Sequence, residues 1–416
     1  MSKTAGIASV ALLLVTSFAM PLQAQMTAGP NRPPTVPEGY VVTPSGYLHP
    51  SCIYTLSKGA LILAEGAAIK RADGSIENVA PCSYPRYTPR GELVSETAPP
   101  AVPLSSTSYF PVFAQTSIES AYAELYADWN VPQAPTTHGT QLVFFWPGLE
   151  SYCSAPCTPA IVLQPVLGWN DYYSNGWGIS SVECCINGNQ FQSSPVGVAP
   201  GDIIEGKVQA NCPAGTLTCA SWNITTLDVD EAASTTLSNA SGDGLTYTYA
   251  DGAVLEEYYV SECSEYPPST SLEFYNIQLY DYNFDLISSP VWGTDIDTGL
   301  TPQCNFGAQP SSTQITLDYG ATLPQTSAPS VSNIQVTTNG GGPSGTNYVY
   351  TMTLSDSANG ATIYYSISAC GVPRVLGSTS PGQFVYKCTG HTGQANLYIY
   401  ALTAGHNPSS VTQASF

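Results

Sequence analysis

The amino-acid sequence predicts an all-β protein, with a large β-sandwich of two antiparallel sheets followed by a second, smaller β-sandwich. Short runs rich in Tyr, Thr, Val and Ile recur along the chain, among them TQLVFFW, AIVLQPVL and SLEFYNIQLYDY. Gly, Asn, Asp and Pro separate these runs, as expected for turns between strands. About 215 residues of repeated short strands suit two packed sheets. The segment SIESAYAELYADW could pass as a helix, but it carries enough tyrosine to be a strand.

Composition divides the chain into five parts. Residues 1–24 have the features of a secretory signal peptide, with Lys3 ahead of an apolar stretch and Leu22-Gln23-Ala24 as the cleavage site. That stretch is too short to span a membrane, so we expect a secreted protein. Residues 25–104 are expected to be a propeptide or a small N-terminal module, and residues 105–322 the main body. A linker at 323–333 and a small sandwich at 334–416 follow.

Charge is distributed unevenly. Residues 101–330 contain 23 Asp and Glu but a single basic residue, Lys207, for a net charge of −22. Residues 25–100 contain six acidic and six basic residues. Such acidity argues against nucleic acid or an anionic membrane as a partner, and it suits either work at low pH or solubility alone. The basic residues of this net-neutral N-terminal part, facing an acidic body, favour a propeptide held by charge.

The twelve cysteines indicate disulfides formed in an oxidising compartment. We expect Cys52–Cys82 and Cys370–Cys388, since each pair lies within one part of the chain. The eight central cysteines cannot be paired from the sequence. A zinc site is not expected, because the Cys153-x3-Cys157 pair has no second pair at suitable spacing and the chain has four histidines.

The remaining chemistry rests on carboxylates and amides. His138 is the one histidine of the body, no Gly-x-Ser-x-Gly occurs there, and no phosphate-binding or dinucleotide motif is present. Gln164 stands in the middle of the apolar run CTPAIVLQPVLGW, where a buried amide needs hydrogen-bond partners. Glu256 lies in the apolar strand GAVLEEYYV, and alternation sends Glu256 and Glu257 to opposite faces. A glutamate in apolar surroundings has a raised pKa and is suited to proton transfer.

Four segments, in order, resemble the fungal glutamic peptidases (eqolisins). YADWNVPQAP (126–135) resembles their opening strand, and FFWPGLE (144–150) resembles their Trp-x-Gly-Ile-Asp segment. CTPAIVLQPVLGW resembles the segment that carries their catalytic Gln, and AVLEEY (253–258) the segment that carries their catalytic Glu. The resemblance covers about residues 120–290. The stretches GATIYYSIS and ANLYIYALTAGHNPSSVTQASF resemble the C-terminal Ig-like domain of chitobiases and β-hexosaminidases, an accessory module.

The resemblance implies a concanavalin-like β-sandwich and a secreted, acid-active endopeptidase made with a propeptide and using no metal or cofactor. It places Gln164 and Glu256 on the catalytic Gln and Glu, with Glu150 as a substrate contact or neighbouring support. Three tryptophans are candidates for the lining of the substrate cleft: Trp146, Trp169 and Trp177. The sequence departs from the family pattern at Gly168, where the family has Asp, and at Ala253, where it has Trp. These departures predict a remodelled cleft.

Two other functions fit the same residues. A β-sandwich with aromatic and acidic side chains also suits a carbohydrate-binding, lectin-like protein without catalysis. A glycosidase could pair Glu256 with Glu150 or another acid. The expected partners are polypeptide substrates, with a polysaccharide as a further partner of the C-terminal module, and we expect a monomer.

Overall fold

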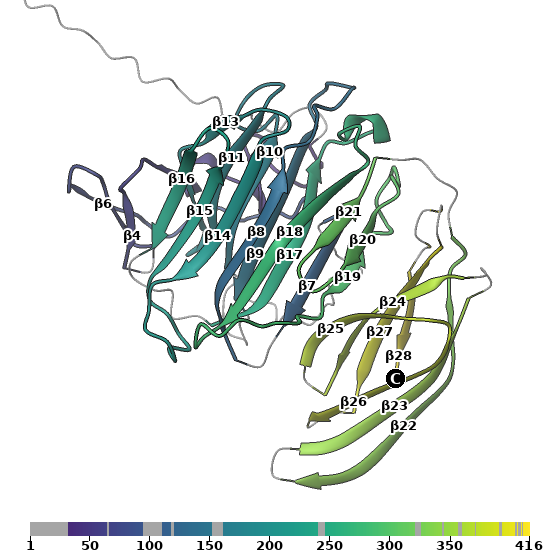
Figure 1. The fold of residues 1–416 in the computed structure, drawn as a ribbon. Coiled ribbons are helices and arrows are strands. Elements are labelled where there is room, and N and C mark those ends of the chain that lie inside the picture. Colours follow the sequence, from purple (N-terminus) through teal and green to yellow (C-terminus); the bar gives the residue numbers. More distant parts are fainter. Residues whose placement is uncertain are drawn as a thin grey trace, which may run out of the picture.

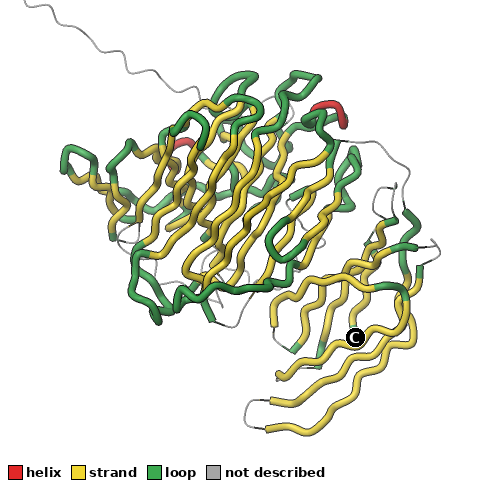
Figure 2. The backbone as a smooth tube through the Cα atoms, viewed as in Figure 1, coloured by secondary structure: helices red, strands yellow, loops and turns green. Residues whose placement is uncertain are grey.

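The computed structural model describes residues 32–64, 66–94, 110–117, 120–151, 161–239, 246–320, 326–342, 345–356, 360–370, 372–390, 393–403, 406, 409 and 411–416. Apart from loops and turns, these residues form β-strands (Figure 2), with short 3₁₀ turns at Pro50–Cys52 and Cys263–Glu265. The all-β prediction is therefore confirmed. The expected signal peptide and the Cys153-x3-Cys157 pair lie outside the described residues.

Two large sheets pack face to face and form the main body (Figure 1). The first sheet has nine strands: β3 (Ile53–Leu56), β7 (Val112–Ser117), β9 (Leu142–Ser151), β10 (Val162–Trp169), β11 (Trp177–Ile186), β12 (Asn189–Ser193), β13 (Val196–Val198), β17 (Tyr247–Tyr258) and β19 (Gly293–Ile296). Their order is β19-β7-β17-β9-β10-β11-β12-β3, with β13 paired to β11. Strands β17, β9 and β10 are thus central.

The second sheet has ten strands: β4 (Leu61–Leu63), β5 (Ala68–Lys70), β6 (Ile76–Asn78), β8 (Tyr122–Asn130), β14 (Ile203–Ala210), β15 (Trp222–Asp228), β16 (Ala233–Asn239), β18 (Ser271–Asp281), β20 (Gly307–Pro310) and β21 (Ile315–Asp318). Strand β8 forms from the segment whose helix or strand character the sequence leaves open. This segment is a strand that pairs with β14 on one side and β18 on the other, in agreement with its high tyrosine content.

The core between the sheets follows from strand alternation. In β15, Trp222, Ile224, Thr226 and Asp228 are buried while the residues between them are partly exposed. In β10, Leu163, Leu167 and Trp169 join the core between the sheets, and Val166 joins an apolar cluster on the opposite, outer face of the first sheet. The outer face of the first sheet is therefore also apolar and is covered by other residues.

Residues 32–94, which we call the N-terminal segment, cover that outer face. Val36, Tyr40 and Tyr47 pack there against side chains of the first sheet. The segment contains a hairpin of β1 (Val41–Thr43) and β2 (Gly46–Leu48). Its strands β3 and β4 pair in parallel with β12 and β16, so the segment extends one edge of each large sheet.

The C-terminal part forms two small sheets around their own core. The three-stranded sheet contains β22 (Ser330–Gly342), β23 (Gly345–Ser355) and β26 (Gly382–Gly390); the four-stranded sheet contains β24 (Thr362–Ala369), β25 (Val372–Thr379), β27 (Ala395–Leu402) and β28 (Thr412–Ser415). In Figure 1 this unit lies beside the β19 end of the body. Leu376 of β25 packs closely on Gly293 of β19, where a larger residue would overlap it.

The described disulfides each close within one part of the chain. The expected pairs Cys52–Cys82 and Cys370–Cys388 are both formed. The body contains Cys184–Cys185, Cys212–Cys219 and Cys263–Cys304. No described disulfide joins the N-terminal segment to the body. In the described part of the chain, no helix has the length and hydropathy needed to cross a membrane.

Candidate functional site

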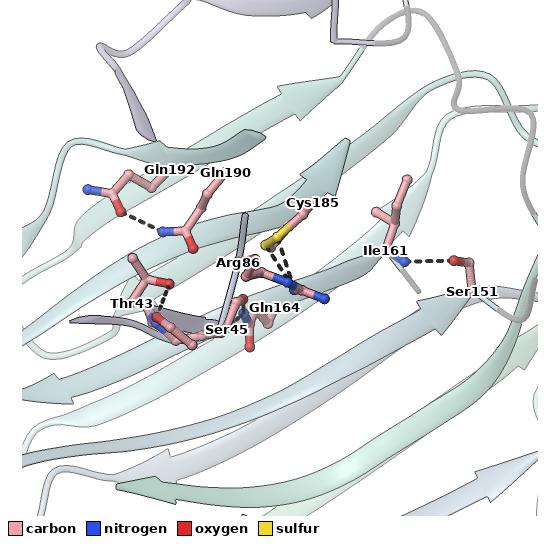
Figure 3. The surroundings of a disulfide bond; sticks show 12 residues. Thr43, Ser45, Arg86, Ser151, Ile161, Gln164, Cys185, Gln190 and Gln192 are labelled. Carbon is pink, nitrogen blue, oxygen red and sulfur yellow. Dashed lines mark hydrogen bonds between the residues drawn. A yellow bond between two sulfur atoms is a disulfide. The ribbon is translucent and has the colours of Figure 1, made fainter. Parts of the chain in front are cut away.

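Gln164 lies in the centre of β10 on the outer face of the first sheet, fully buried. Its amide Nε2 donates to the backbone carbonyl of Pro44 at 2.7 Å and to Ser45 Oγ at 3.3 Å. Both partners belong to the turn of the β1–β2 hairpin (Figure 3). Its carbonyl oxygen Oε1 is buried without a hydrogen-bond partner. Gln164 therefore contacts a peptide group and keeps one acceptor free.

Glu256 lies in β17, also fully buried on the outer face. Its carboxylate accepts from Tyr258 Oη at 2.6 Å and from Trp146 Nε1 at 3.3 Å. Burial raises the pKa of Glu256 to about 8, while the hydrogen bonds from Tyr258 and Trp146 and the charge of Arg86 act in the opposite direction. Desolvation thus outweighs the donors, and Glu256 is protonated at neutral and acid pH in this form.

One turn of the N-terminal segment connects the two residues. Tyr258 Oη, which lies 2.6 Å from Glu256 Oε1, also lies 2.9 Å from the carbonyl oxygen of Thr43, and its single proton is shared between these two acceptors. Thr43 directly precedes Pro44, whose carbonyl Gln164 binds. The register places Glu256 opposite Phe144, and Phe144 opposite Gly168, four residues beyond Gln164. The β1–β2 turn therefore bridges the four-residue offset between Gln164 and Glu256 along the strands.

Arg86 brings a positive charge from the N-terminal segment to the same place. Its guanidinium lowers the pKa of Glu256, against the larger effect of burial. It also donates to Cys185 Sγ at 3.1 Å, which is one of the two sulfurs of the Cys184–Cys185 disulfide (Figure 3). A second arginine, Arg90, forms an ion pair with the buried Asp297 of the body. Among the described residues, Arg90–Asp297 is therefore an ion pair of the kind expected between basic residues of the N-terminal segment and acidic residues of the body.

Asp171 and Tyr172 also belong to the site, although no sequence pattern predicted them. They lie in the turn between β10 and β11, and Asp171 acts electrostatically on Glu256 and raises its pKa. Burial of the carboxyl raises the pKa of Asp171 itself to about 7, although part of the residue reaches the solvent. Tyr172 lies over Gly168 and Gly178, paired opposite each other in the two strands. At Gly168, where the resembled family has Asp, a Cβ would lie 3.1 Å from the ring of Phe144 and 3.5 Å from that of Tyr172, so a side chain there would require Phe144 to move.

The other predicted site residues are placed in three different environments. Trp146 lies between Gln164 and Glu256 on β9 and hydrogen-bonds Glu256. Trp169 and Trp177 pack with their rings tilted and 5.2 Å between ring centroids, in the core between the sheets and on the opposite face from Gln164. The structure does not bring them to the site, because Trp169 occupies an inward-facing, odd-numbered position of β10 and Trp177 is paired directly opposite it in β11.

Glu150 belongs to a separate polar cluster. Gln115 Nε2 donates to Glu150 Oε2 at 3.2 Å and to Asp251 Oδ1 at 2.9 Å. Glu150 pairs opposite Tyr249, whereas Glu256 pairs opposite Phe144. Six residues of strand separate the two carboxylates, about 20 Å along β9. That is too far for the two acids of a glycosidase, which stand roughly 5–10 Å apart.

Comparison with known proteins finds similarity among solved structures only. No protein-family model and no curated protein matches the sequence. Among solved structures, the chain is similar to scytalido-glutamic peptidase, crystallised with a transition state analog inhibitor. The two chains are 17% identical, with a TM-score of 0.35. The similarity covers 98% of that chain and 50% of this one.

Proposed function

We propose that this protein is a secreted, acid-active endopeptidase of the glutamic type, in which Glu256 is the general base and Gln164 stabilises the oxyanion. The observation that carries the proposal is the binding of the β1–β2 turn, whose backbone carbonyls contact Gln164 and Tyr258. A peptide carbonyl, that of Pro44, lies 2.7 Å from the amide nitrogen of Gln164 in a buried site. The neighbouring carbonyl, that of Thr43, lies within hydrogen-bond distance of the Tyr258 hydroxyl, which also contacts the carboxyl of Glu256. The site therefore has the groups needed to bind a polypeptide backbone.

The proposed reaction uses these contacts on a substrate peptide. Ionised Glu256 takes a proton from a water molecule, and the hydroxide attacks the peptide carbonyl carbon. The negative charge that develops on the carbonyl oxygen accepts hydrogen bonds from the Gln164 amide, while Gln164 Oε1 accepts from the attacking water. Glu256 then donates its proton to the leaving nitrogen as the C–N bond breaks. The products are a carboxylic acid and an amine.

The form with the N-terminal segment in place is proposed to be the inactive zymogen. A base must be ionised, and burial keeps Glu256 protonated with a pKa of about 8. The segment contributes to that burial, since Tyr47 packs edge-on to Tyr258 with ring centroids 5.4 Å apart. Loss of the segment would hydrate the carboxyl and lower its pKa towards its ordinary range, where it can act as a base at acid pH. Export would agree with the disulfides of the chain.

Acidification of the purified protein tests the proposal. The secreted protein is incubated with denatured protein substrate at about pH 3–4, followed by gel electrophoresis and sequencing of any new N-terminus of the enzyme itself. We expect substrate fragments and self-trimming before about residue 105. Glu256→Gln should remove both activities, and Gln164→Ala should lower the rate by about 10²–10³-fold through loss of the oxyanion donor.

Glu257→Gln is the matched control. Glu257 is the next residue in the same strand, its Oε2 is also buried, but its side chain points to the other face. The control should cleave at the wild-type rate. Equal activity of the Glu256→Gln variant would refute the assignment of the base. Absence of cleavage at every pH in the wild type would refute the peptidase, and the protein would next be tested on a glycan array for the lectin-like alternative.

A further inference from the structure

Three aspartates meet at one end of the second sheet, far from Gln164 in the fold. Asp202 precedes β14, Asp228 ends β15 and Asp230 follows it. One carboxylate oxygen from each lies within 4.8 Å of the others. Backbone amides fix all three side chains: Ala199 N donates to Asp202 Oδ2 at 2.6 Å, Ile203 N to Asp230 Oδ2 at 2.8 Å, and Asp230 N to Asp228 Oδ1 at 3.1 Å.

Asp228 gives a separate reason to expect a ligand here. It occupies a core-facing position of β15, in line with Trp222, Ile224 and Thr226, and is 1% exposed. Its Oδ1 accepts from Asp230 N and Glu231 N, whereas its second oxygen, Oδ2, is buried and no described N–H group donates to it; the side chain beside it is the carboxyl of Asp202. A buried carboxylate oxygen without a donor is costly, typically by more than a neutral group. The strand pattern alone would place an apolar residue at this position.

The chain offers no cation to neutralise these carboxylates from the body. Residues 101–330 contain one basic residue, Lys207, and its Nζ pairs with Glu124 at 3.1 Å. Lys207 stands five residues along β14 from Asp202, about 16 Å away along an extended strand. Three carboxylate groups held together without a counter-charge repel one another.

We propose that Asp202, Asp228 and Asp230 bind a calcium ion. Calcium is coordinated by six to eight oxygens at about 2.3–2.6 Å, so two ligands on opposite sides of the ion stand about 4.8 Å apart. The spacing of the three carboxylates meets that limit. Asp228 Oδ2 gains the partner that it lacks, and water fills the remaining positions. Loop-borne carboxylates of irregular arrangement suit calcium better than magnesium, which requires near-ideal octahedral geometry.

Calcium titration of the whole secreted protein tests the proposal. The protein is freed of metal with a chelator, and binding is measured at pH 7 by isothermal titration calorimetry, with thermal unfolding in 0–5 mM CaCl₂. We expect one site per chain and a rise in melting temperature of roughly 3–8 °C. The isosteric variant Asp228→Asn should abolish binding and the temperature rise. Without calcium it should melt no lower than the wild type, because it removes like-charge repulsion.

Asp285→Asn is the matched control, since Asp285 is an exposed aspartate whose side chain forms no hydrogen bond or ion pair with the described residues. It should bind calcium like the wild type. Absence of calcium binding by the wild type would overturn the proposal. Unchanged binding by both Asp228→Asn and Asp230→Asn would also overturn it, as would equal loss in the Asp285→Asn control. None of these outcomes depends on whether the protein cleaves peptides.

Discussion

Glu256 and Glu257 are adjacent residues of β17 whose carboxyl groups enter two different buried environments. Glu256 lies under the N-terminal segment, and Glu257 faces Glu265 on the other side of the sheet. Burial raises the pKa of both to about 8, with the charge of Glu265 adding to the effect on Glu257. Glu257 retains some exposed surface as a residue, but its Oε2 is buried, and it is the carboxyl that matters for the pKa.

These two groups predict that the protein is stable in acid and loses stability towards alkaline pH. The ordinary pKa of each carboxyl is 4.5, so between pH 4.5 and about 8 the folded state holds protons that the unfolded state has released. The free energy of unfolding should therefore be highest below pH 4.5 as far as these groups are concerned. It should fall by up to about 1.4 kcal/mol per pH unit per group as the pH rises to 8.

Urea unfolding between pH 4 and 9 measures this slope. The double variant Glu256→Gln/Glu257→Gln should have a flatter profile over the same range, because an amide does not titrate. A wild-type stability that rises from pH 4.5 to 8 would contradict the predicted direction. A slope equal in wild type and double variant would assign it to other groups, of which Asp171 is the first to test.

At the residue scale, local pattern predicts the placement of Gln164 and Glu256 but not their surroundings. Alternation within β17 separates Glu256 from Glu257, as predicted, whereas the position of Gln164 and Glu256 in the same sheet follows from strand pairing. Asp171 and Arg86 reach the site from a turn and from a distant segment. Their proximity depends on tertiary packing, which has no counterpart in local sequence. The inward position of Trp169 could be predicted from the sequence, because residues 164 and 169 of one strand are an odd number of positions apart and point to opposite faces.

At the scale of single elements, the β1–β2 hairpin holds the N-terminal segment in the site. Gly46 adopts a φ of +108°, a conformation that other residues rarely adopt. A Cβ at this position would overlap the carbonyl oxygen of Tyr87, which also accepts from Tyr47 N at 2.8 Å. The hairpin therefore lies close against the later part of its own segment, and a glycine is required at this contact.

Gly46→Ala should loosen the segment over the site. The strain and the overlap should displace the turn from Gln164, and a loss of about 1.4 kcal/mol corresponds to a roughly tenfold larger open population. Trypsin at neutral pH should then cut the segment at Arg86 and Arg90 about ten times faster. Gly74→Ala is the control, because Gly74 also has a positive φ of +86° but meets no atom within 4 Å. Equal cutting of the two variants would show that backbone strain, not the Tyr87 contact, controls the segment.

Element types were predicted better than element partners. Strands such as β15 follow from alternation, and the same is true of β8 once its tyrosines are weighed. The pairing of β3 with β12 joins residues more than 130 positions apart, and no local signal marks it. The N-terminal segment could thus be anticipated as a unit from its charge and prolines, but its place at two sheet edges could not.

At the scale of the whole molecule, non-covalent contacts hold the N-terminal segment to the body. The disulfide of the segment, Cys52–Cys82, closes within it, and no described disulfide crosses to the body. Arg90 pairs with Asp297, and the body around it is strongly acidic. Protonation of carboxylates in acid weakens such attraction, and so does salt.

We therefore expect a nicked molecule to release the segment in acid without reduction. A site for a specific protease is inserted between residues 94 and 110 of the Glu256→Gln variant, and the cut protein is analysed by size-exclusion chromatography and mass spectrometry. The segment should remain bound at pH 7 in low salt and separate at about pH 3 in 1 M salt. Retention under both conditions would mean that the apolar contacts of Tyr40 and Tyr47 are sufficient to hold it.

Release of the segment would have a cost for solubility. Strands β12 and β16 would each lose a parallel neighbour, and their sequences, NQFQS and ASTTLSN, contain no charged residue and no proline. Such uncharged open edges are templates for pairing with another extended chain. A mature form lacking residues 32–94 should accordingly self-associate, or capture unfolded polypeptide along its rims, unless another strand takes the vacated places.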